Sequence, residues 1–194
     1  MLFELFLVWL SIPFYLLFLF NWVRKKYSFK IIIINTFLFI SIMFFIAEKV
    51  FPIPIDNEVI ELFNMEEYRI INNFIAFKTI IEMVNAYGFE NFIYILLFLY
   101  YQIRTMFVIG FILPFALNKD CTIFEIFKKL LILIVSLEVV KTVITLIINV
   151  NYKGYDIDII LLNFLGGVLG YLTYNFMVKI IRNKLKSKKV ITYN

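Results

Sequence analysis

Long runs of apolar side chains, separated by shorter polar or charged segments, dominate the pattern of this chain. A helix needs about 20 mostly apolar residues to cross the hydrocarbon core of a bilayer. We predict a membrane-spanning helix in each of five such runs: residues 2–23, 31–50, 92–117, 127–150 and 159–181. The pattern therefore predicts an all-α fold, an integral membrane helical bundle that forms a single membrane domain over residues 1–194.

The composition agrees with a membrane protein and excludes an ordinary soluble domain. Hydrophobic residues make up 63% of the chain, charged residues make up 17%, and the mean hydropathy is +0.92. Soluble domains have about half apolar and about a quarter charged residues. The 24 Phe and 12 Tyr side chains are hard to keep out of water in a small globule, whereas lipid contacts such a surface directly.

The distribution of Lys and Arg between the loops predicts the orientation of the chain. Cytoplasmic loops are enriched in these two residues. Basic residues gather at 24–30, at 119–129 and in the tail at 182–189, whereas the segments 51–90 and 151–158 hold few. Five spans then alternate consistently, with the N-terminus outside and the C-terminus in the cytoplasm.

The segment 51–90 carries most of the acidic residues, and part of it has the spacing of an amphipathic helix. Apolar residues recur at helical intervals over 70–85, and polar residues lie between them. Such a helix lies in the membrane interface with its apolar face towards the lipid. We therefore predict an extracytoplasmic interfacial helix at 70–85.

Three charged residues lie inside the predicted spans: Arg104 in the third, and Glu138 and Lys141 in the fourth. A charge at the bilayer centre costs about 2.5–3.5 kcal/mol on insertion scales, so such residues face the bundle interior, pair, or line a wet cavity. One interpretation is structural, with Arg104 bridging to Glu138 to hold the bundle together. The other is a ligand site, and the two are compatible.

A second polar group stands at the start of the fifth span, within "YKGYDIDIILLNFLGGVLGY" at residues 152–171. Asp156 and Asp158 lie where a carboxylate can cap the free N–H groups of a helix N-terminus. Lys153 precedes them, and Asn163 follows on the same helix. We predict a polar pocket that opens outwards, with the charges of the third and fourth spans as its floor and these four residues as its rim.

Glycines follow the same segment, and their spacing indicates helix packing. Gly166 and Gly170 form a G-x-x-x-G pattern, which allows close backbone approach between membrane helices, and Gly167 lies between them. We expect these three glycines to pack the fifth span against the fourth. A homodimer through Gly166 and Gly170 is a further possibility.

The sequence lacks the residues that several classes of catalytic and metal sites require. The chain has no histidine and one cysteine, which removes histidine-metal sites, Ser-His and Cys-His nucleophile pairs, and an intrachain disulfide. The net charge of +5 comes from basic residues at the membrane borders, so it indicates no nucleic-acid partner. We predict no catalytic residue, resident metal or cofactor, and we expect a non-enzymatic protein.

Four stretches resemble the VanZ-like family of bacterial membrane proteins, over about half of the chain. They are "NFIAFKTI" at 73–80, "VIGFILP" at 108–114, "SLEVVK" at 136–141, and "KGYDIDIILLNFLGGVLGY" at 153–171. Lys141 stands where the family commonly has Gln, and Ile159 where it often has Asp, so the chain resembles a divergent member. The family is named for a protein associated with low-level teicoplanin resistance.

The resemblance implies a role in the bacterial cell envelope. We expect the pocket to bind an amphiphilic ligand: a membrane lipid, a lipid-linked cell-wall intermediate or a lipoglycopeptide. Two alternatives remain open. The chain can be an intramembrane enzyme on a lipid-linked substrate, with Glu138 as general base and Asp156 or Asp158 holding a divalent metal, or it can be a small transporter or assembly subunit.

Overall fold

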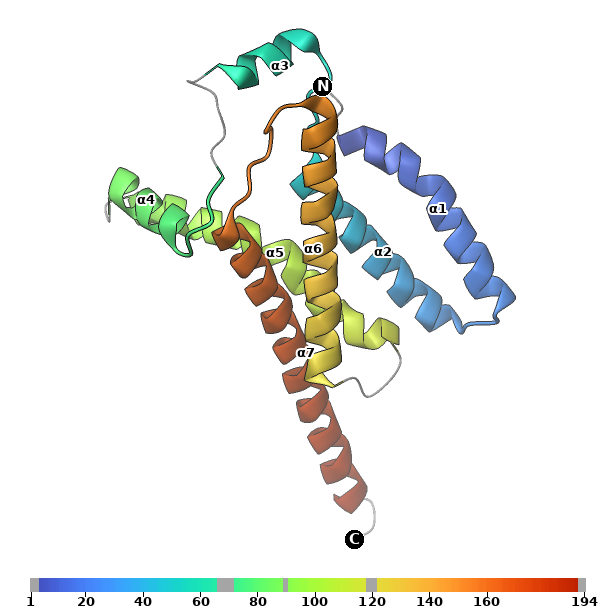
Figure 1. Cartoon of the computed structure of the whole chain (residues 1–194). Helices are drawn as coiled ribbons and strands as arrows, with labels where there is room; N and C mark the ends of the chain where they lie inside the picture. Colours follow the sequence, from blue (N-terminus) through green and yellow to red (C-terminus); the bar gives the residue numbers. More distant parts are fainter. Residues whose placement is uncertain (1–3, 66–71, 89–90, 118–121, 192–194) are drawn as a thin grey trace.

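The computed structural model describes residues 4–65, 72–88, 91–117 and 122–191 (Figure 1). Within these ranges the chain is mainly helical and contains no extended strand, and an isolated β-bridge joins Asn73 to Asp156. The five long helices are α1 (Glu4–Arg24), α2 (Phe29–Val50), α5 (Phe92–Leu117), α6 (Ile123–Ile148) and α7 (Ile157–Ile191), and the two short ones are α3 (Asn57–Asn64) and α4 (Lys78–Tyr87).

Four of the described helices are long and apolar enough to cross a membrane, which indicates a multi-pass membrane protein. They are α2, α5, α6 and the part of α7 that runs over Ile157–Ile181. The helical segment α1 matches the first predicted span, of which residues 2 and 3 lie outside the described residues. Its membrane crossing, and hence the count of five, stays a prediction.

Local capping explains where the helices depart from the predicted bounds. The bounds of α5 match the prediction, whereas α6 begins four residues earlier, at Ile123, because Thr122 and Glu125 form a reciprocal capping box. It ends at Ile148, since Asn149 adopts a left-handed conformation with φ of 54°. The helix α7 continues through the basic tail to Ile191.

The prediction of one helix over 70–85 is wrong for residues 72–77. Residues 70 and 71 lie outside the described residues, and 72–77 form an extended stretch and a turn before α4 begins at Lys78. The cause is a long-range contact: Asn73 forms a parallel β-bridge with Asp156, in which the Ile157 N–H donates to the Asn73 carbonyl at 3.0 Å. The helix α3 had no counterpart in the prediction.

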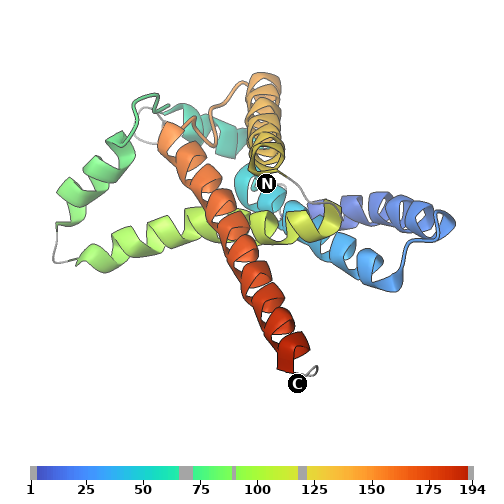
Figure 2. The ribbon, with the colours of Figure 1, turned by 90° about the horizontal axis from the view of Figure 1, so that it is seen from below.

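The bundle centres on the crossing of α5 and α7, while α1 and α2 form a hairpin at one side. Figures 1 and 2 show α4 projecting from the opposite side of the bundle. Apolar side chains from α2, α5, α6 and α7 form the buried core. Its members are Phe45, Val50, Phe51, Met106, Ile109, Ile126, Leu130, Ile134, Leu137 and Tyr171.

Glycines make the α5–α7 crossing possible. A Cβ on Gly166 would overlap the Ile103 carbonyl oxygen, and one on Gly170 would overlap that of Phe107. Gly167 lies against both helices: a Cβ on it would meet the side chain of Leu130 on α6, and a Cβ on Gly110 of α5 would overlap its carbonyl oxygen. The expectation that the glycines pack against the fourth span is therefore wrong for Gly166 and Gly170, which lie against the third.

This packing also bears on the proposed homodimer. The backbones of Gly166 and Gly170 are covered by α5 of the same chain. The two glycines thus serve packing within one chain, and the homodimer stays a prediction.

We expect Gly170→Ala to destabilise the bundle more than Gly167→Ala. The added methyl group at 170 meets rigid backbone of α5, whereas at 167 its nearest neighbour is the Leu130 Cδ1, 2.8 Å away on a flexible side chain. Overpacking costs about 1–3 kcal/mol. Thermal unfolding in detergent measures the difference. Equal midpoints for the two variants would contradict the close approach of α5 and α7.

Candidate functional site

The two aspartates at the start of α7 tie this helix to α4. The Asp156 carboxylate accepts from the Asp158 N–H at 2.9 Å, from Asn73 Nδ2 at 3.1 Å and from the Thr79 hydroxyl at 2.7 Å. The first bond is an N-cap of α7. We call Asn73, Thr79, Asp156 and Asp158 the aspartate clamp.

The second aspartate of the clamp caps the other helix. Asp158 is 1% exposed, and its carboxylate accepts the Thr79 N–H at 2.9 Å and the Phe77 N–H at the N-terminus of α4. Phe77 reaches this position with φ of 66°, in the left-handed region. The structure gives both aspartates a capping role, each on a different helix.

A polar cavity of about 330 Å³ lies beside the clamp, where α2 ends, α7 begins, and α5 and α6 pass. Its lining residues are Glu48, Lys49, Tyr101, Gln102, Arg104, Lys141, Lys153, Gly154, Asp156 and Ile159. A smaller cavity of about 180 Å³ adjoins it through Lys141, Lys153 and Gly154. Four predicted site residues, Arg104, Lys141, Lys153 and Asp156, thus share one cavity wall.

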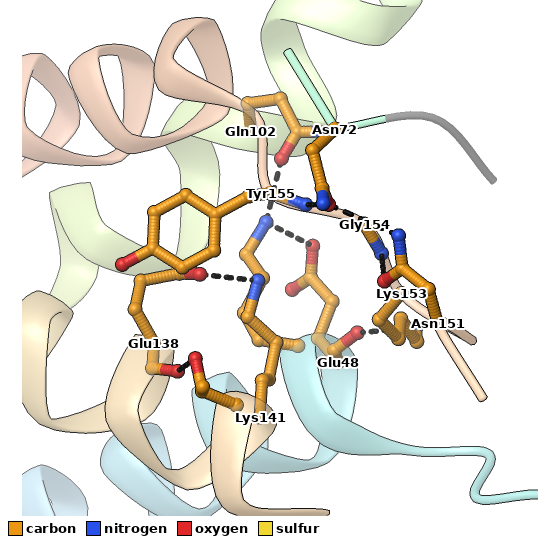
Figure 3. Close-up of polar contacts among 11 residues, drawn as sticks. Glu48, Asn72, Gln102, Glu138, Lys141, Asn151, Lys153, Gly154 and Tyr155 are labelled. Atoms are coloured by element: carbon orange, nitrogen blue, oxygen red, sulfur yellow. Dashed lines mark hydrogen bonds and ion pairs between the residues drawn. The ribbon is translucent and has the colours of Figure 1, made fainter. Parts of the chain in front are cut away.

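Glu138 lies directly beneath this wall in a buried ion pair. Its Oε2 is 2.6 Å from the Lys141 Nζ, one helical turn along α6. The Lys141 ammonium also lies 5.8 Å from the centre of the Tyr155 ring. Figure 3 shows both α6 side chains pointing towards the space that Glu48 of α2 enters from the other side. The charges of the fourth span therefore face the bundle interior.

Arg104 does not pair with Glu138, contrary to the structural interpretation. Its Nη2 lies 3.8 Å from the Glu48 Oε2, and its guanidinium carbon stacks 4.7 Å from the centre of the Tyr101 ring. The same Glu48 oxygen accepts from the Thr105 hydroxyl at 2.8 Å. The residue that neutralises Arg104 is thus Glu48, which the sequence reasoning did not select.

Glu48 and its neighbour Lys49 organise the α2 side of the cavity. The Lys49 Nζ lies 3.7 Å from the Glu48 Oε1 and donates to the Gln102 Oε1 of α5 at 2.5 Å. Lys153 donates to the Glu48 carbonyl oxygen at 3.3 Å. The signal for both missed residues was present in the sequence, since two charges stand in the last turn of an apolar span.

The loop before α7 is held against the segment that leads into α4. The Asn72 Oδ1 accepts hydrogen bonds from the Tyr155 N–H at 2.7 Å and from the Asn151 Nδ2 at 3.0 Å.

Two tyrosines of this loop have raised pKa values. Burial raises the pKa of the Tyr152 hydroxyl to about 12, because it disfavours the charged phenolate. Burial, and then the negative charge of Glu138, raise the pKa of Tyr155. Both hydroxyls therefore stay protonated at neutral pH.

Asn163 and Asp158 lie outside the cavity wall. Asn163 is 3% exposed, and its Oδ1 has no hydrogen-bond partner within the described residues. In the described ranges, no three Asp, Glu, Cys or His side chains are placed to hold a metal ion.

Comparison with protein-family models, with curated proteins and with solved structures gave no match. The site must therefore be interpreted from its own geometry. It is a cavity among membrane helices, walled by four cations and two carboxylates.

Proposed function

We propose that this chain is a VanZ-like cell-envelope protein that binds an amphiphilic ligand in the polar cavity. The observation that carries the proposal is the wall itself, which gathers four cations and two carboxylates among helices whose outer faces are apolar. Ionisable residues within membrane spans mark ligand and ion pathways. A ligand with a polar headgroup and an apolar tail matches both surfaces.

The proposal includes a location in the membrane. The protein lies in the bacterial cell membrane with its N-terminus outside and its C-terminus in the cytoplasm, and α1 crosses the membrane in addition to the four other long helices. The cavity then faces outwards, because it lies at the C-terminal end of α2 and the N-terminal end of α7. In this orientation α4 lies in the outer interface, near lipids, lipid-linked cell-wall intermediates and lipoglycopeptides.

The structure offers less support for the enzyme alternative. That alternative assigns Asp156 or Asp158 to a divalent metal, yet their carboxylates already accept hydrogen bonds from the clamp. A metal would have to displace donors that hold two helix N-termini. We therefore favour ligand binding, through which the protein contributes to teicoplanin and lipoglycopeptide resistance.

Expression in a teicoplanin-susceptible bacterial host tests this function. We expect the wild type to raise the inhibitory concentration of teicoplanin several-fold and to leave that of vancomycin, which has no lipid tail, unchanged. Arg104→Gln should abolish the protection at wild-type membrane levels, measured by immunoblot. Lys129→Met, which removes an exposed charge from α6, is the matched control. Unchanged teicoplanin sensitivity with well-expressed wild type would overturn the resistance role.

A further inference from the structure

The charges of the cavity wall indicate what kind of headgroup fits. Lys141 is paired with Glu138, and the Asp156 carboxylate accepts three hydrogen bonds from the clamp. The remaining wall holds Lys49, Arg104 and Lys153 against the carboxylates of Glu48 and Asp156. One formal positive charge is thus in excess, which favours an anionic headgroup.

The geometry around Glu48 leaves its cations available to a second anion. The Lys49 and Arg104 nitrogens lie 3.7 and 3.8 Å from its carboxylate oxygens. Charge-assisted N–H···O bonds are about 2.7–2.9 Å long, so these are loose contacts. The Arg104 Nε is buried and has no hydrogen-bond partner among the described residues. A guanidinium has five donors in a planar fork, which matches the oxygens of a phosphate group.

Arg104 also belongs to a second surface feature, an apolar groove between α2 and α5. The groove has a volume of about 310 Å³ and is lined by Ile40, Ser41, Phe44, Tyr100, Arg104, Thr105 and Val108. Its two aromatic residues, Phe44 and Tyr100, are 61% and 59% exposed, on the face that meets lipid in a membrane. Arg104 therefore stands where the polar cavity and the apolar groove meet.

We infer that the ligand is a lipid phosphate, a long hydrocarbon chain that ends in a phosphomonoester or diphosphate. Arg104 and Lys49 bind the phosphate group in the cavity, and the part of the hydrocarbon chain next to the phosphate lies in the α2–α5 groove. This inference rests on the proposed function and specifies its ligand class. A terminal phosphate group offers three free oxygens to Arg104 and Lys49, whereas a phosphodiester offers two and a neutral headgroup carries no charge for them.

Binding to the purified full chain in detergent micelles tests the headgroup. Native mass spectrometry would compare a polyprenyl phosphate, the polyprenol of the same length, phosphatidylglycerol and inorganic diphosphate. We expect the polyprenyl phosphate to bind at least tenfold more tightly than the other three probes. If the polyprenol or phosphatidylglycerol binds equally well, the phosphate assignment is overturned while amphiphile binding stands. If inorganic diphosphate binds equally well, the hydrocarbon chain of the ligand adds no affinity, and its assignment to the groove is overturned.

Two variants separate the roles of the cavity and the groove. Arg104→Gln should weaken polyprenyl phosphate binding at least tenfold, and Val108→Trp, which fills the groove, should weaken it while leaving the binding of inorganic diphosphate unchanged. Val135→Trp is the matched control, because Val135 is 49% exposed on α6 and Val108 is 43% exposed on α5. If Arg104→Gln does not fold, the headgroup comparison and Val108→Trp decide the question. If no amphiphile binds the folded wild type, the proposed function itself fails.

Discussion

Replacing Lys141 by Met lowers the stability of the bundle sharply, whereas replacing Glu138 by Gln in the same molecule restores most of it. The two side chains form a buried pair at 2.6 Å, so removing the lysine leaves a carboxylate without its counter-charge. Breaking a buried ion pair in this way costs about 3–5 kcal/mol, while replacing both partners is often neutral. Lys141→Met should therefore unfold at a much lower temperature than the double variant.

Thermal unfolding in detergent, followed by the fluorescence of the tryptophans, measures this cycle. Lys129→Met is the control, because it makes the same substitution at an exposed position of α6. We expect its midpoint to stay close to that of the wild type. If Lys141→Met alone is as stable as the wild type, the ion pair contributes nothing to the stability of the fold. A double variant that folds but no longer binds ligand would show that the pair also serves the cavity.

The spans could be predicted from the sequence because the requirement behind them is local. A segment enters the hydrocarbon core if about 20 consecutive residues are apolar, whatever the rest of the chain does. The bounds of α5 were accordingly predicted to the residue, and those of α2 within two residues. The helix α6 begins earlier than predicted because of its capping box and ends two residues earlier because Asn149 is left-handed. The helix α7 is longer than predicted because the basic tail continues it.

The contacts between helices could not be predicted in the same way. Which face of α5 meets α2 depends on rotation and tilt, and these follow from packing over the whole bundle. Arg104 was therefore assigned to Glu138, although Glu48 lies beside it. The glycines illustrate the same limit, since their spacing predicted close packing but not that α5 would be the partner of Gly166 and Gly170.

The prediction of a helix over 70–85 was wrong for a different reason. Its apolar spacing is helical, but Asn73 forms a β-bridge with Asp156, 83 positions further along the chain. This contact holds residues 72–77 in an extended stretch and a turn instead of a helix. Local periodicity carries no information about such a contact.

Asp158→Ala should release α4 from the bundle. The carboxylate is buried and accepts two backbone N–H groups at the start of α4, so its removal leaves both donors without their acceptor. Hydrogen bonds to a charged group contribute about 1.5–3 kcal/mol each. The expected loss for two bonds is about 3–6 kcal/mol, concentrated where α4 joins α7.

Hydrogen exchange of the purified protein in detergent, read by mass spectrometry, measures this release. The amides of α4 should exchange about 100-fold faster or more, because each 1.4 kcal/mol is a factor of ten. The amides of α6 should be unchanged. Asp56→Ala is the matched control: Asp56 caps the exposed helix α3 by accepting the Glu58 N–H, and its loss should affect α3 alone. Unchanged protection of α4 in Asp158→Ala would show that the apolar contacts of α4 hold it without the clamp, and the two aspartates would then have to be explained by the cavity beside them.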